Sequence, residues 1–463
     1  MRLVYLIDFG STYTKITAVD IHREEIVAAA KAPTTVGTNV MEGLGNARAL
    51  LEKQLAGHAF EVVEKISSSS AAGGLRMSAI GLVPKLTMHA ARTALLSSGA
   101  KLASCFAYEM VPEDVEALLA SKPDIILLSG GTDGGNGSTI AHNAAMLARS
   151  AVDVPIIMAG NRCARHCVCE VLENAGKEVL VTDNVLPQLD CLNIDPVREI
   201  VRDLFIRRIV AAKGIEAAMA YVDRILMPTP TAVLQAAKLI AAGDGATPGL
   251  GDLMVVDIGG ATTDVHSIGK GLPQASSSIF LKGIPEPYDK RTVEGDMGVR
   301  YNARTILETV GAPVFAETLG FPEGEVENWV ERVSADTDLL PANERESRID
   351  RELARWACRI SVTRHVGHVE SFYTPTGVTF AQYGKDLTGV RALIGTGGPL
   401  VHLDDPAAVL GAALFDPAEP ERLRPREPRF YIDGSYILYA VGLLAADYPG
   451  PALRIAGKYL QTI

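Results

Sequence analysis

The chain has 463 residues, of which 48% are hydrophobic and 21% charged, and this balance excludes a disordered or fibrous protein. A formal net charge of −11 without a basic run excludes a dedicated nucleic-acid binder, whose backbone contacts need clustered lysine and arginine. The length predicts roughly two to four packed domains, and several domains imply clefts between them.

The start of the chain and its cysteines carry no sign of export. The opening apolar run is interrupted by Asp8, far short of a signal-peptide core or of a membrane span of about 20 residues. Six scattered cysteines do not resemble a disulfide framework, so reduced thiols are expected. We therefore expect a cytoplasmic protein that binds neither membranes nor nucleic acid, and the sequence leaves a homo-oligomer open.

Strand and helix patterns alternate from the amino terminus onward. A Gly-Ser turn that is short enough for a hairpin separates the first two strands, so a sheet opens the chain. Strand patterns occupy residues 3–9, 13–20, 25–31 and, with a flexible turn, 62–74, and helical patterns occupy residues near 43–56 and 85–98.

Between residues 112 and 183, short apolar strands alternate with helical segments. Such alternation predicts parallel strands with crossover helices and indicates an additional α/β segment. Helical patterns at 197–212 and 231–242 follow, and the Gly/Pro-rich stretch 243–251 separates them from a new strand-rich unit.

Two stretches of the sequence match each other in residue type. "LIDFGSTYTKITAVD" begins at Leu6, and "VVDIGGATTDVHSIG" begins at Val255. Each contains an apolar strand, an aspartate, one apolar residue, a glycine, small and hydroxyl residues, and a second strand. Two equivalent hairpins, each opening an α/β unit, indicate a duplicated architecture with a cleft between its halves.

The residue types in these turns suit the phosphate tail of a nucleotide. Glycine lets backbone amides approach phosphate oxygens, hydroxyls add donors, and Lys15 supplies a positive charge. Asp8 and Asp257, facing each other across a cleft, can hold a hydrated Mg²⁺, which needs only one or two carboxylates besides phosphate. The other predicted contacts are Gly10, Ser11, Thr12, Gly259, Gly260, Thr262 and Thr263, with Asp264 orienting water or metal. The alternative is a pair of ordinary hairpin turns, which favour the same residue types.

Together the two turns resemble the phosphate loops of the actin, Hsp70 and sugar-kinase ATPase superfamily. Three more segments resemble its connecting helices and its adenosine motif, in the family's order: "MPTPTAVLQAA" (227–237), "LIGTGGPLV" (393–401) and "SYILYAVGLLA" (435–445). The resemblance implies a two-lobed, duplicated ribonuclease H-like α/β fold that binds Mg–ATP between the lobes. The adenosine would lie over Gly395, Gly397 and Gly398.

One position departs from the superfamily's pattern. Chaperone members usually place an acid before the proline of the first connecting motif, where it helps to position the hydrolytic water. Here Thr229 precedes Pro230. The resemblance therefore implies nucleotide binding and leaves ATP hydrolysis open, with a weak ATPase as the most that it suggests.

Within the superfamily the chain is most similar to the MutL/GlmL group. This likeness is carried by "LIDFGSTYTK", "LLSGGTDGGN", "MPTPTAVL", "DIGGATTDV" and "IGTGGPL". It implies an ATP-binding accessory protein, a chaperone or reactivating factor for an adenosylcobalamin-dependent mutase such as glutamate (methylaspartate) mutase. The alternatives are a small-molecule kinase or related ATP-dependent enzyme that uses the same cleft, and a nucleotide-gated filament or scaffold.

The resemblance also implies domain boundaries. The first lobe would begin with residues 1–110 and return, with its connecting helix, at 191–243. The additional α/β segment would occupy 111–190, and the second lobe 252–463.

Two further motifs lie inside the additional segment. The glycine-rich stretch 127–136 separates a strand from a helix, and it either faces a partner or second ligand or uses glycine for loop geometry alone. Cys163, His166, Cys167 and Cys169 cluster around one helix. Part of this set could approach one metal, but packing of a crossover helix by small residues is the favoured interpretation.

Two motifs in the second half have equally ordinary alternatives. His365 and His368 lie in a helical pattern near 348–370, and a satisfied surface or interface histidine is favoured over a cobalt ligand. The stretch 294–303 brings Glu294, Asp296 and Arg300 close to two glycines. It either lines the cleft or forms a helix N-terminus with favourably placed acids.

Overall fold

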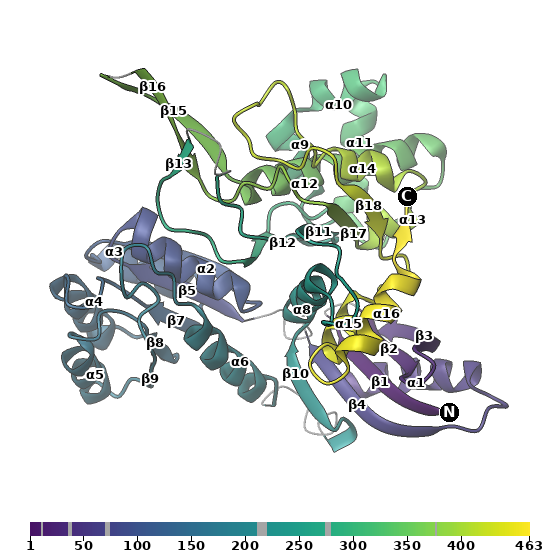
Figure 1. The fold of residues 1–463 in the computed structure, drawn as a ribbon, viewed down its shortest axis with the longest axis horizontal. Coiled ribbons are helices and arrows are strands. Elements are labelled where there is room, and N and C mark those ends of the chain that lie inside the picture. Colours follow the sequence, from purple (N-terminus) through teal and green to yellow (C-terminus); the bar gives the residue numbers. More distant parts are fainter. Residues whose placement is uncertain (11–12, 36–38, 70–74, 211–219, 274–278, 376) are drawn as a thin grey trace. The chain divides into compact units, whose positions relative to one another are not determined.

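The computed structural model describes residues 1–463 except 11–12, 36–38, 70–74, 211–219, 274–278 and 376 (Figure 1). The chain forms two compact units, and each is described by itself. Unit 1 contains Met1–Ala236, Gly283–Pro285 and Tyr439–Ile455, and unit 2 contains Ala237–Lys282, Glu286–Leu438 and Ala456–Ile463. Within the described ranges, no helix combines the length and hydropathy needed to span a bilayer.

The first sheet of unit 1 has the strand order β10-β4-β1-β2-β3. Its strands are β1 (Arg2–Phe9), β2 (Tyr13–Asp20), β3 (Glu25–Pro33), β4 (Glu61–Ser69) and β10 (Arg224–Pro228). The central strand β1 is buried from its second residue onward, as expected of a strand covered on both faces. β1 and β2 form the predicted antiparallel hairpin, whereas β4 runs parallel to β1. The four strands expected before residue 74 are therefore confirmed.

Helix α1 (Val40–Gln54) packs against this sheet. Its first turn is capped by Asn39, whose side chain accepts a hydrogen bond from the amide of Met41. Leu44 and Leu51 recur at helical spacing on one face and are buried in the core beneath the sheet. The helix predicted near 43–56 is confirmed.

The largest sheet of unit 2 repeats this topology. Its order is β14-β12-β11-β17-β18-β19, so that, as in unit 1, the first strand lies between its hairpin partner and the fourth strand. The strands are β11 (Leu253–Ile258), β12 (Thr263–Ile268), β14 (Asp289–Glu294), β17 (Ala392–Thr396), β18 (Arg429–Ile432) and β19 (Gln461–Thr462). In both sheets the first three strands are antiparallel and the fourth and fifth run parallel to the first. The duplicated architecture is confirmed.

Helices and a small second sheet complete unit 2. The helices are α9 (Ala303–Val310), α10 (Ala312–Leu319), α11 (Glu323–Ala335), α12 (Glu344–His365), α13 (Gly398–His402) and α14 (Pro406–Gly411). The small sheet combines β13 (Ile279–Leu281), β15 (His368–Thr374) and β16 (Gly377–Tyr383). The prediction that His365 and His368 share one long helix is wrong, because α12 ends at His365 and His368 begins β15.

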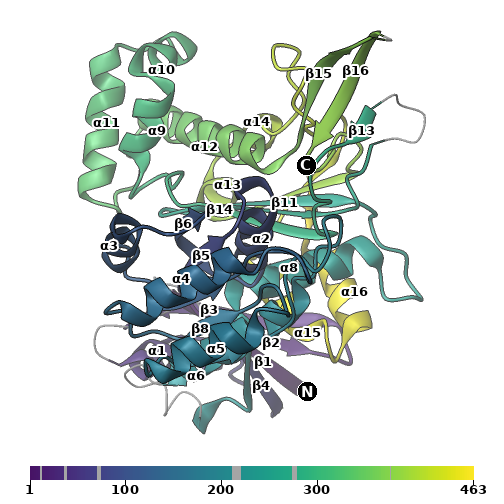
Figure 2. The same cartoon turned by 90° about the vertical axis from the view of Figure 1, so that its left-hand side faces the viewer.

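A separate parallel sheet lies in unit 1, with helices α4 and α5 side by side along it (Figure 2). Its strands are β5 (Arg76–Gly81), β6 (Lys101–Ala107), β7 (Ile125–Leu128), β8 (Ile156–Met158) and β9 (Val179–Val181). The order β6-β5-β7-β8-β9 is the doubly wound order of flavodoxin-like folds. Its helices are α2 (His89–Ser97), α3 (Pro112–Ala120), α4 (Ser138–Arg149) and α5 (Arg165–Asn174), and a π-helical turn, η1 (Pro84–Met88), precedes α2.

The parallel strands predicted between residues 112 and 183 are confirmed as β7, β8 and β9. The sequence patterns did not predict β5 and β6. These two strands belong to the same sheet. The domain boundaries that we expect from sequence stay predictions.

The remaining helices are α6 (Asp195–Val210), α8 (Thr229–Ala242), α15 (Leu438–Leu444) and α16 (Pro449–Tyr459). α8 and α15 approach closely at Gly442, where an added Cβ would lie 1.8 Å from the carbonyl oxygen of Ala232. Only glycine therefore fits this crossing of the two predicted connecting helices.

Candidate functional site

The first hairpin turn is closed by one backbone hydrogen bond. The amide of Gly10 donates to the carbonyl of Tyr13 at 3.1 Å, and an added Cβ on Gly10 would lie 2.4 Å from that oxygen. The register places Lys15 directly opposite Asp8, with its ammonium 4.0 Å from Asp8 Oδ2. The predicted phosphate contacts Ser11 and Thr12 lie outside the described residues.

Asp8 is a buried carboxylate held by two hydroxyl groups. Its side chain accepts hydrogen bonds at Oδ1 from Thr229 Oγ1 at 2.5 Å and from Ser68 Oγ at 3.2 Å. Ser68 is brought there by the parallel pairing of β1 with β4, and Thr229 by the end of β10. Burial raises the pKa of Asp8, and the charge of Lys15 and the two hydroxyls oppose that rise in part. Thr229 stands where chaperone members of the superfamily usually have an acid. Here its hydroxyl supports Asp8, the aspartate of the first hairpin.

The second hairpin turn is closed by the equivalent bond. The amide of Gly259 donates to the carbonyl of Thr262 at 2.9 Å, and the register places Asp264 opposite Asp257. Asp264 is paired with the buried guanidinium of Arg291, at 2.5 Å from Nη2 and 2.8 Å from Nε. The first hairpin therefore has Lys15 opposite its aspartate. The second has Asp264 at the equivalent position, and the charge of Asp264 is neutralised by Arg291 from the neighbouring strand β14.

The two threonines of this turn differ in what their hydroxyls do. Thr262 donates to Asp264 Oδ2 at 3.3 Å on a partly exposed side chain. Thr263 is fully buried and donates its one hydroxyl hydrogen to the carbonyl of Met297 at 2.7 Å. Of the two hydroxyls, only that of Thr262 lies at an accessible position.

The predicted adenosine motif lies directly beside the second hairpin. β17 pairs with β11 so that Thr396 is opposite Asp257, and α13 starts two residues later at Gly398. Gly397 has a φ of +97°, and an added Cβ would lie 2.2 Å from the carbonyl oxygen of Ile258 and 2.8 Å from Asp257 Oδ1. Glycine is required there both by the backbone conformation and by the close approach.

The other two glycines of the motif have different surroundings. A Cβ on Gly395 would lie 3.0 to 3.1 Å from side chains of Leu400, Leu410 and Ile432, so this glycine packs tightly in the core. A Cβ on Gly398 would meet nothing within 4 Å. The open side of the motif is therefore at Gly398, the residue after the glycine that meets Asp257.

Sequence reasoning missed Asp433 and Tyr436, which also lie at this end of the sheet. Asp433 follows β18, is 1% exposed, and accepts hydrogen bonds from the amides of Ile437 and Leu438 and from Thr396 Oγ1. Burial, followed by the charges of Asp257 and Asp433, raises the pKa of Tyr436 to about 12. The signal that was available is positional: Asp433 follows the fifth strand of its sheet just as Thr229 follows β10.

The segment 294–303 packs against the turn of the second hairpin and donates hydrogen bonds to it. The amides of Arg300 and Tyr301 both donate to the carbonyl of Gly260 at 2.9 Å, and a Cβ on Gly298 would lie 2.2 Å from the carbonyl carbon of Ala261. Its charged side chains are paired. Arg364 binds Glu294 at 2.8 Å and Asp296 at 2.7 Å, and Asp350 binds Arg300 at 2.5 Å.

The glycine-rich loop of the additional sheet is closed by two buried asparagines. Asn161 accepts at Oδ1 from the amide of Gly134 and donates to the carbonyl of Gly135, and Asn184 donates to the carbonyl of Gly131 and to Asp133. Beside it lies a hollow of 400 Å³ lined by Asp133, Arg162, Arg165, Asp183, Asn184, Pro187 and Asn193. The loop is thus a pre-shaped element at the carboxyl ends of the strands.

The side chains of the cysteine cluster, which the structure describes, do not come together as a set of three metal ligands. Within the part of the chain that the structure describes, no group of three or more metal-ligating side chains comes together. The alternative, that the cysteines pack the crossover helix, is wrong for Cys163 and Cys167, which are both exposed, and only Cys169 packs partly against the core. α5 packs instead through Val168 and Leu172, which follow the helical period.

His365 is a core residue with both ring nitrogens satisfied. It is fully buried, and its Nδ1 and Nε2 lie 2.8 Å from Thr292 Oγ1 and Ser267 Oγ, respectively. Burial lowers the pKa of His365 well below its usual range. The expectation of a satisfied histidine is confirmed, but its place is the core and not the surface.

Two sheets of the same strand order, each with an acid-glycine hairpin at its start, define the duplicated ribonuclease H-like fold of the actin, Hsp70 and sugar-kinase superfamily. The chain belongs to the MutL protein family, whose model matches residues 4–460. It is 47% identical to "Protein MutL" of Clostridium tetanomorphum over 463 residues, which is 100% of both chains.

Solved structures resemble the chain only weakly. A nucleotide-free acetone carboxylase has 14% identity and a TM-score of 0.39, with 96% of this chain and 70% of that chain covered. The xylulose kinase of Bifidobacterium adolescentis has 12% identity and a TM-score of 0.32, with 100% and 95% covered. Likenesses of this size indicate nothing about activity.

Proposed function

We propose that this chain binds Mg–ATP with its two acid-glycine hairpins and acts as an accessory protein for an adenosylcobalamin-dependent mutase. The observation that carries the nucleotide site is the repetition of one hairpin. In both copies an equivalent glycine amide closes the turn, an equivalent aspartate is the last residue but one of the strand, and a parallel neighbour brings a hydroxyl residue beside it. Membership in the MutL family supports the accessory role.

The surroundings of Asp8 fit a bound cation. Its carboxylate is buried, and its Oδ2 receives no hydrogen bond from the described residues, with only Lys15 at 4.0 Å. A desolvated carboxylate with one open oxygen is stabilised by a divalent ion, because Mg²⁺ prefers oxygen ligands and keeps several waters. Asp8 and Asp257 would hold this ion, and Mg²⁺ would neutralise charge on the phosphates.

The chain's own residues would bind and orient the nucleotide. The two turns, with Gly10, Ser11, Thr12, Gly259, Gly260 and Thr262, would surround the phosphates, and Lys15 would add a positive charge. Thr263, whose buried hydroxyl is bonded to the carbonyl of Met297, would support the second turn instead of contacting phosphate. Gly395, Gly397 and Gly398 would form the floor of the adenosine site, with Gly398 on the open side. Asp264 would orient a water or the metal, but only while Arg291 holds its other oxygen. ATP would change the relation of the two units, and a mutase subunit that prefers one arrangement would be captured or released.

The nucleotide site is tested by calorimetry with Mg–ATP on Asp257→Asn. We expect at least a tenfold weaker affinity, about 1.4 kcal/mol, with an unchanged fold by circular dichroism. Asp404→Asn is the matched control, since Asp404 is an exposed acid of the same unit. An unchanged affinity in Asp257→Asn would remove the assignment.

The accessory role needs a separate experiment. Affinity purification from the native cells with and without ATP should recover a mutase subunit in a nucleotide-dependent manner. Nucleotide-dependent phosphorylation of a metabolite without mutase capture would instead identify a small-molecule kinase. Asp257→Asn should lose the nucleotide dependence of capture if the two proposals are linked.

A further inference from the structure

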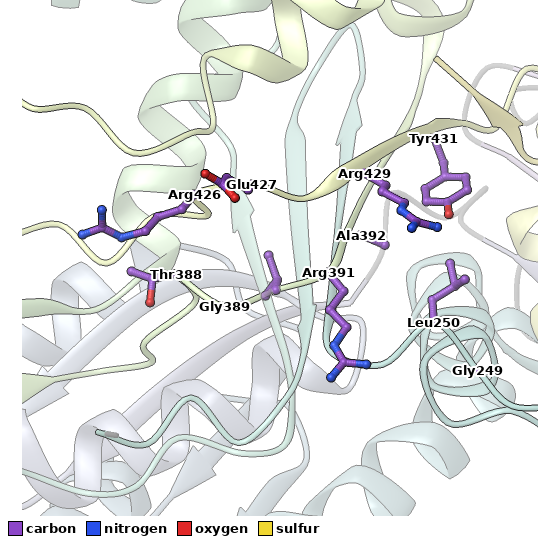
Figure 3. A pocket seen from close by; sticks show the side chains of 11 residues that line it. Gly249, Leu250, Thr388, Gly389, Arg391, Ala392, Arg426, Glu427, Arg429 and Tyr431 are labelled. Atoms are coloured by element: carbon purple, nitrogen blue, oxygen red, sulfur yellow. The ribbon is translucent and has the colours of Figure 1, made fainter. Parts of the chain in front are cut away.

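A second hollow lies in unit 2. It is at the end of the largest sheet that lies opposite the turn between β11 and β12. Its volume is 720 Å³. It is lined by Gly249, Leu250, Thr388, Gly389, Val390, Arg391, Ala392, Arg426, Glu427, Arg429 and Tyr431 (Figure 3). These residues precede or begin the three parallel strands β11, β17 and β18. The hairpin aspartate and Gly397 lie where β11 and β17 end. A strand of five residues spans about 17 Å, so the two sites are separate.

The hollow carries uncompensated positive charge. Arg391, Arg426 and Arg429 are all exposed, and among the described residues none of them forms an ion pair with a carboxylate. Glu427 also lines the hollow without an ion pair, which leaves a local excess of positive charge in a chain whose formal net charge is −11. Three guanidinium groups and one carboxylate around one cavity leave a net positive charge, which favours an external anion.

The backbone holds two of these arginines next to each other. The amide of Arg429 donates to the carbonyl of Arg391 at 2.9 Å, and the amide of Arg391 donates to the backbone carbonyl of Asp252 at 2.7 Å. In Figure 3 both lie on the side of Leu250 and Tyr431, where Arg429 extends toward Tyr431 and Arg391 extends away from it. Because neighbouring strands fix both backbones, the two guanidinium groups are carried on rigid elements rather than on a loop.

The third arginine lies well apart from this pair. In Figure 3 Arg426 extends to the other side of the hollow, near Thr388, and its guanidinium stacks on Phe415 at 4.0 Å from the ring centroid. Stacking holds the guanidinium without neutralising it. Leu250, Val390 and Ala392 add apolar atoms to the lining. The hollow therefore has arginines on two sides and a partly apolar lining.

We propose that this hollow binds a small organic anion that carries at least two carboxylate or phosphate groups on a partly apolar body. Arg391 and Arg429 bind one anionic group, and Arg426 binds the other. Guanidinium groups bind carboxylate and phosphate oxygens in pairs of hydrogen bonds, which makes arginine the suitable reader for either. The volume lies within the range of about 300 to 1,000 Å³ that small-molecule sites occupy. This site does not depend on the proposed nucleotide site.

The test uses the full chain at low ionic strength with two probes, pyrophosphate and glutarate, titrated by calorimetry. The probes separate phosphate from carboxylate recognition. We expect at least one to bind, and we expect Arg429→Ala or Arg391→Ala to weaken it about tenfold. Arg429→Lys should recover part of the loss, because it restores charge but not the paired hydrogen bonds. Arg304→Ala, an exposed arginine elsewhere in unit 2, is the control and should not change the affinity.

Each other outcome overturns the proposal. Failure of both probes to bind, or equal affinity in the wild type and the arginine variants, removes the site. Binding that is lost in Asp257→Asn belongs to the nucleotide site instead, so the same variant distinguishes the two proposals. Capture of a polyglutamate peptide with no binding of either small probe would replace the small molecule by an acidic protein segment. Thermal unfolding of each variant shows that a loss of binding is not a loss of fold.

Discussion

The two hairpins share a backbone but differ in how they balance charge. In the first, Asp8 is opposite Lys15 and receives hydroxyl hydrogen bonds from Ser68 and Thr229. In the second, Asp257 is opposite another acid, Asp264, which is neutralised by an arginine from β14. The difference teaches that the repeated turn conserves geometry, while each sheet supplies its own counter-charges through neighbouring strands.

The largest expected effect is at the ion pair of the second hairpin. Arg291→Met should lower the free energy of unfolding by about 3 to 5 kcal/mol, because it leaves a mostly buried carboxylate without its partner. Lys15→Met should cost less than about 1 kcal/mol, since Lys15 is 31% exposed and 4.0 Å from its acid. Urea denaturation measures both. Equal losses in the two variants would contradict the contrast between the hairpins.

The second prediction concerns the glycine that meets Asp257. Gly397→Ala should lower the free energy of unfolding by about 2 kcal/mol, because φ is +97° and the new Cβ would collide with the carbonyl of Ile258. Gly260→Ala is the control within the same site, since its Cβ would lie 3.5 Å from the nearest atom, and a change within about 0.5 kcal/mol is expected. Thermal unfolding compares the two. A stable Gly397→Ala would show that the motif does not pack against the hairpin.

The third prediction tests the hydroxyl support that only the first hairpin has. Thr229→Val should lower the free energy of unfolding by about 1.5 kcal/mol, because a buried carboxylate loses a donor. It should also raise the pKa of Asp8 further. Thr229→Ser keeps the hydroxyl and should retain most of the stability. Similar stabilities of the valine and serine variants, measured by urea denaturation, would show that this hydrogen bond does not support Asp8.

The smallest expected effect is on the pH dependence of stability without metal or nucleotide. Because the folded-state pKa of Asp8 is raised, the folded chain binds more protons than the unfolded chain between the ordinary carboxyl pKa, about 4, and that raised value. The contribution of Asp8 to stability therefore falls as the pH rises through this window. Asp8→Asn should remove this contribution and be the more stable protein near neutral pH.

Urea denaturation at several pH values compares Asp8→Asn with the wild type. Asp404→Asn, which removes the carboxylate of an exposed side chain, is the control variant. A wild-type slope in Asp8→Asn would mean that this carboxylate is ionised at no cost in the folded chain. Added Mg–ATP should stabilise the wild type and not Asp8→Asn.

The sequence by itself determined the local elements of this molecule. The two hairpins, the break near residues 243–251 and the parallel strands after residue 112 follow from turn residues and apolar periodicity, which act over a few neighbours. The pairing of Gly10 with Tyr13 and of Gly259 with Thr262 is local in the same sense. The helix predicted near 348–370 does not continue past His365, because α12 ends there while the polar and apolar pattern continues into β15.

Only the tertiary structure decided what surrounds the two aspartates. Ser68 and Thr229 reach Asp8 across 60 and 221 residues of chain, because β4 and β10 pair beside β1. Arg291 and Tyr436 reach the second hairpin in the same way, from β14 and from the segment after β18. Strand order and register place these side chains, and both depend on long-range pairing, which no local pattern encodes.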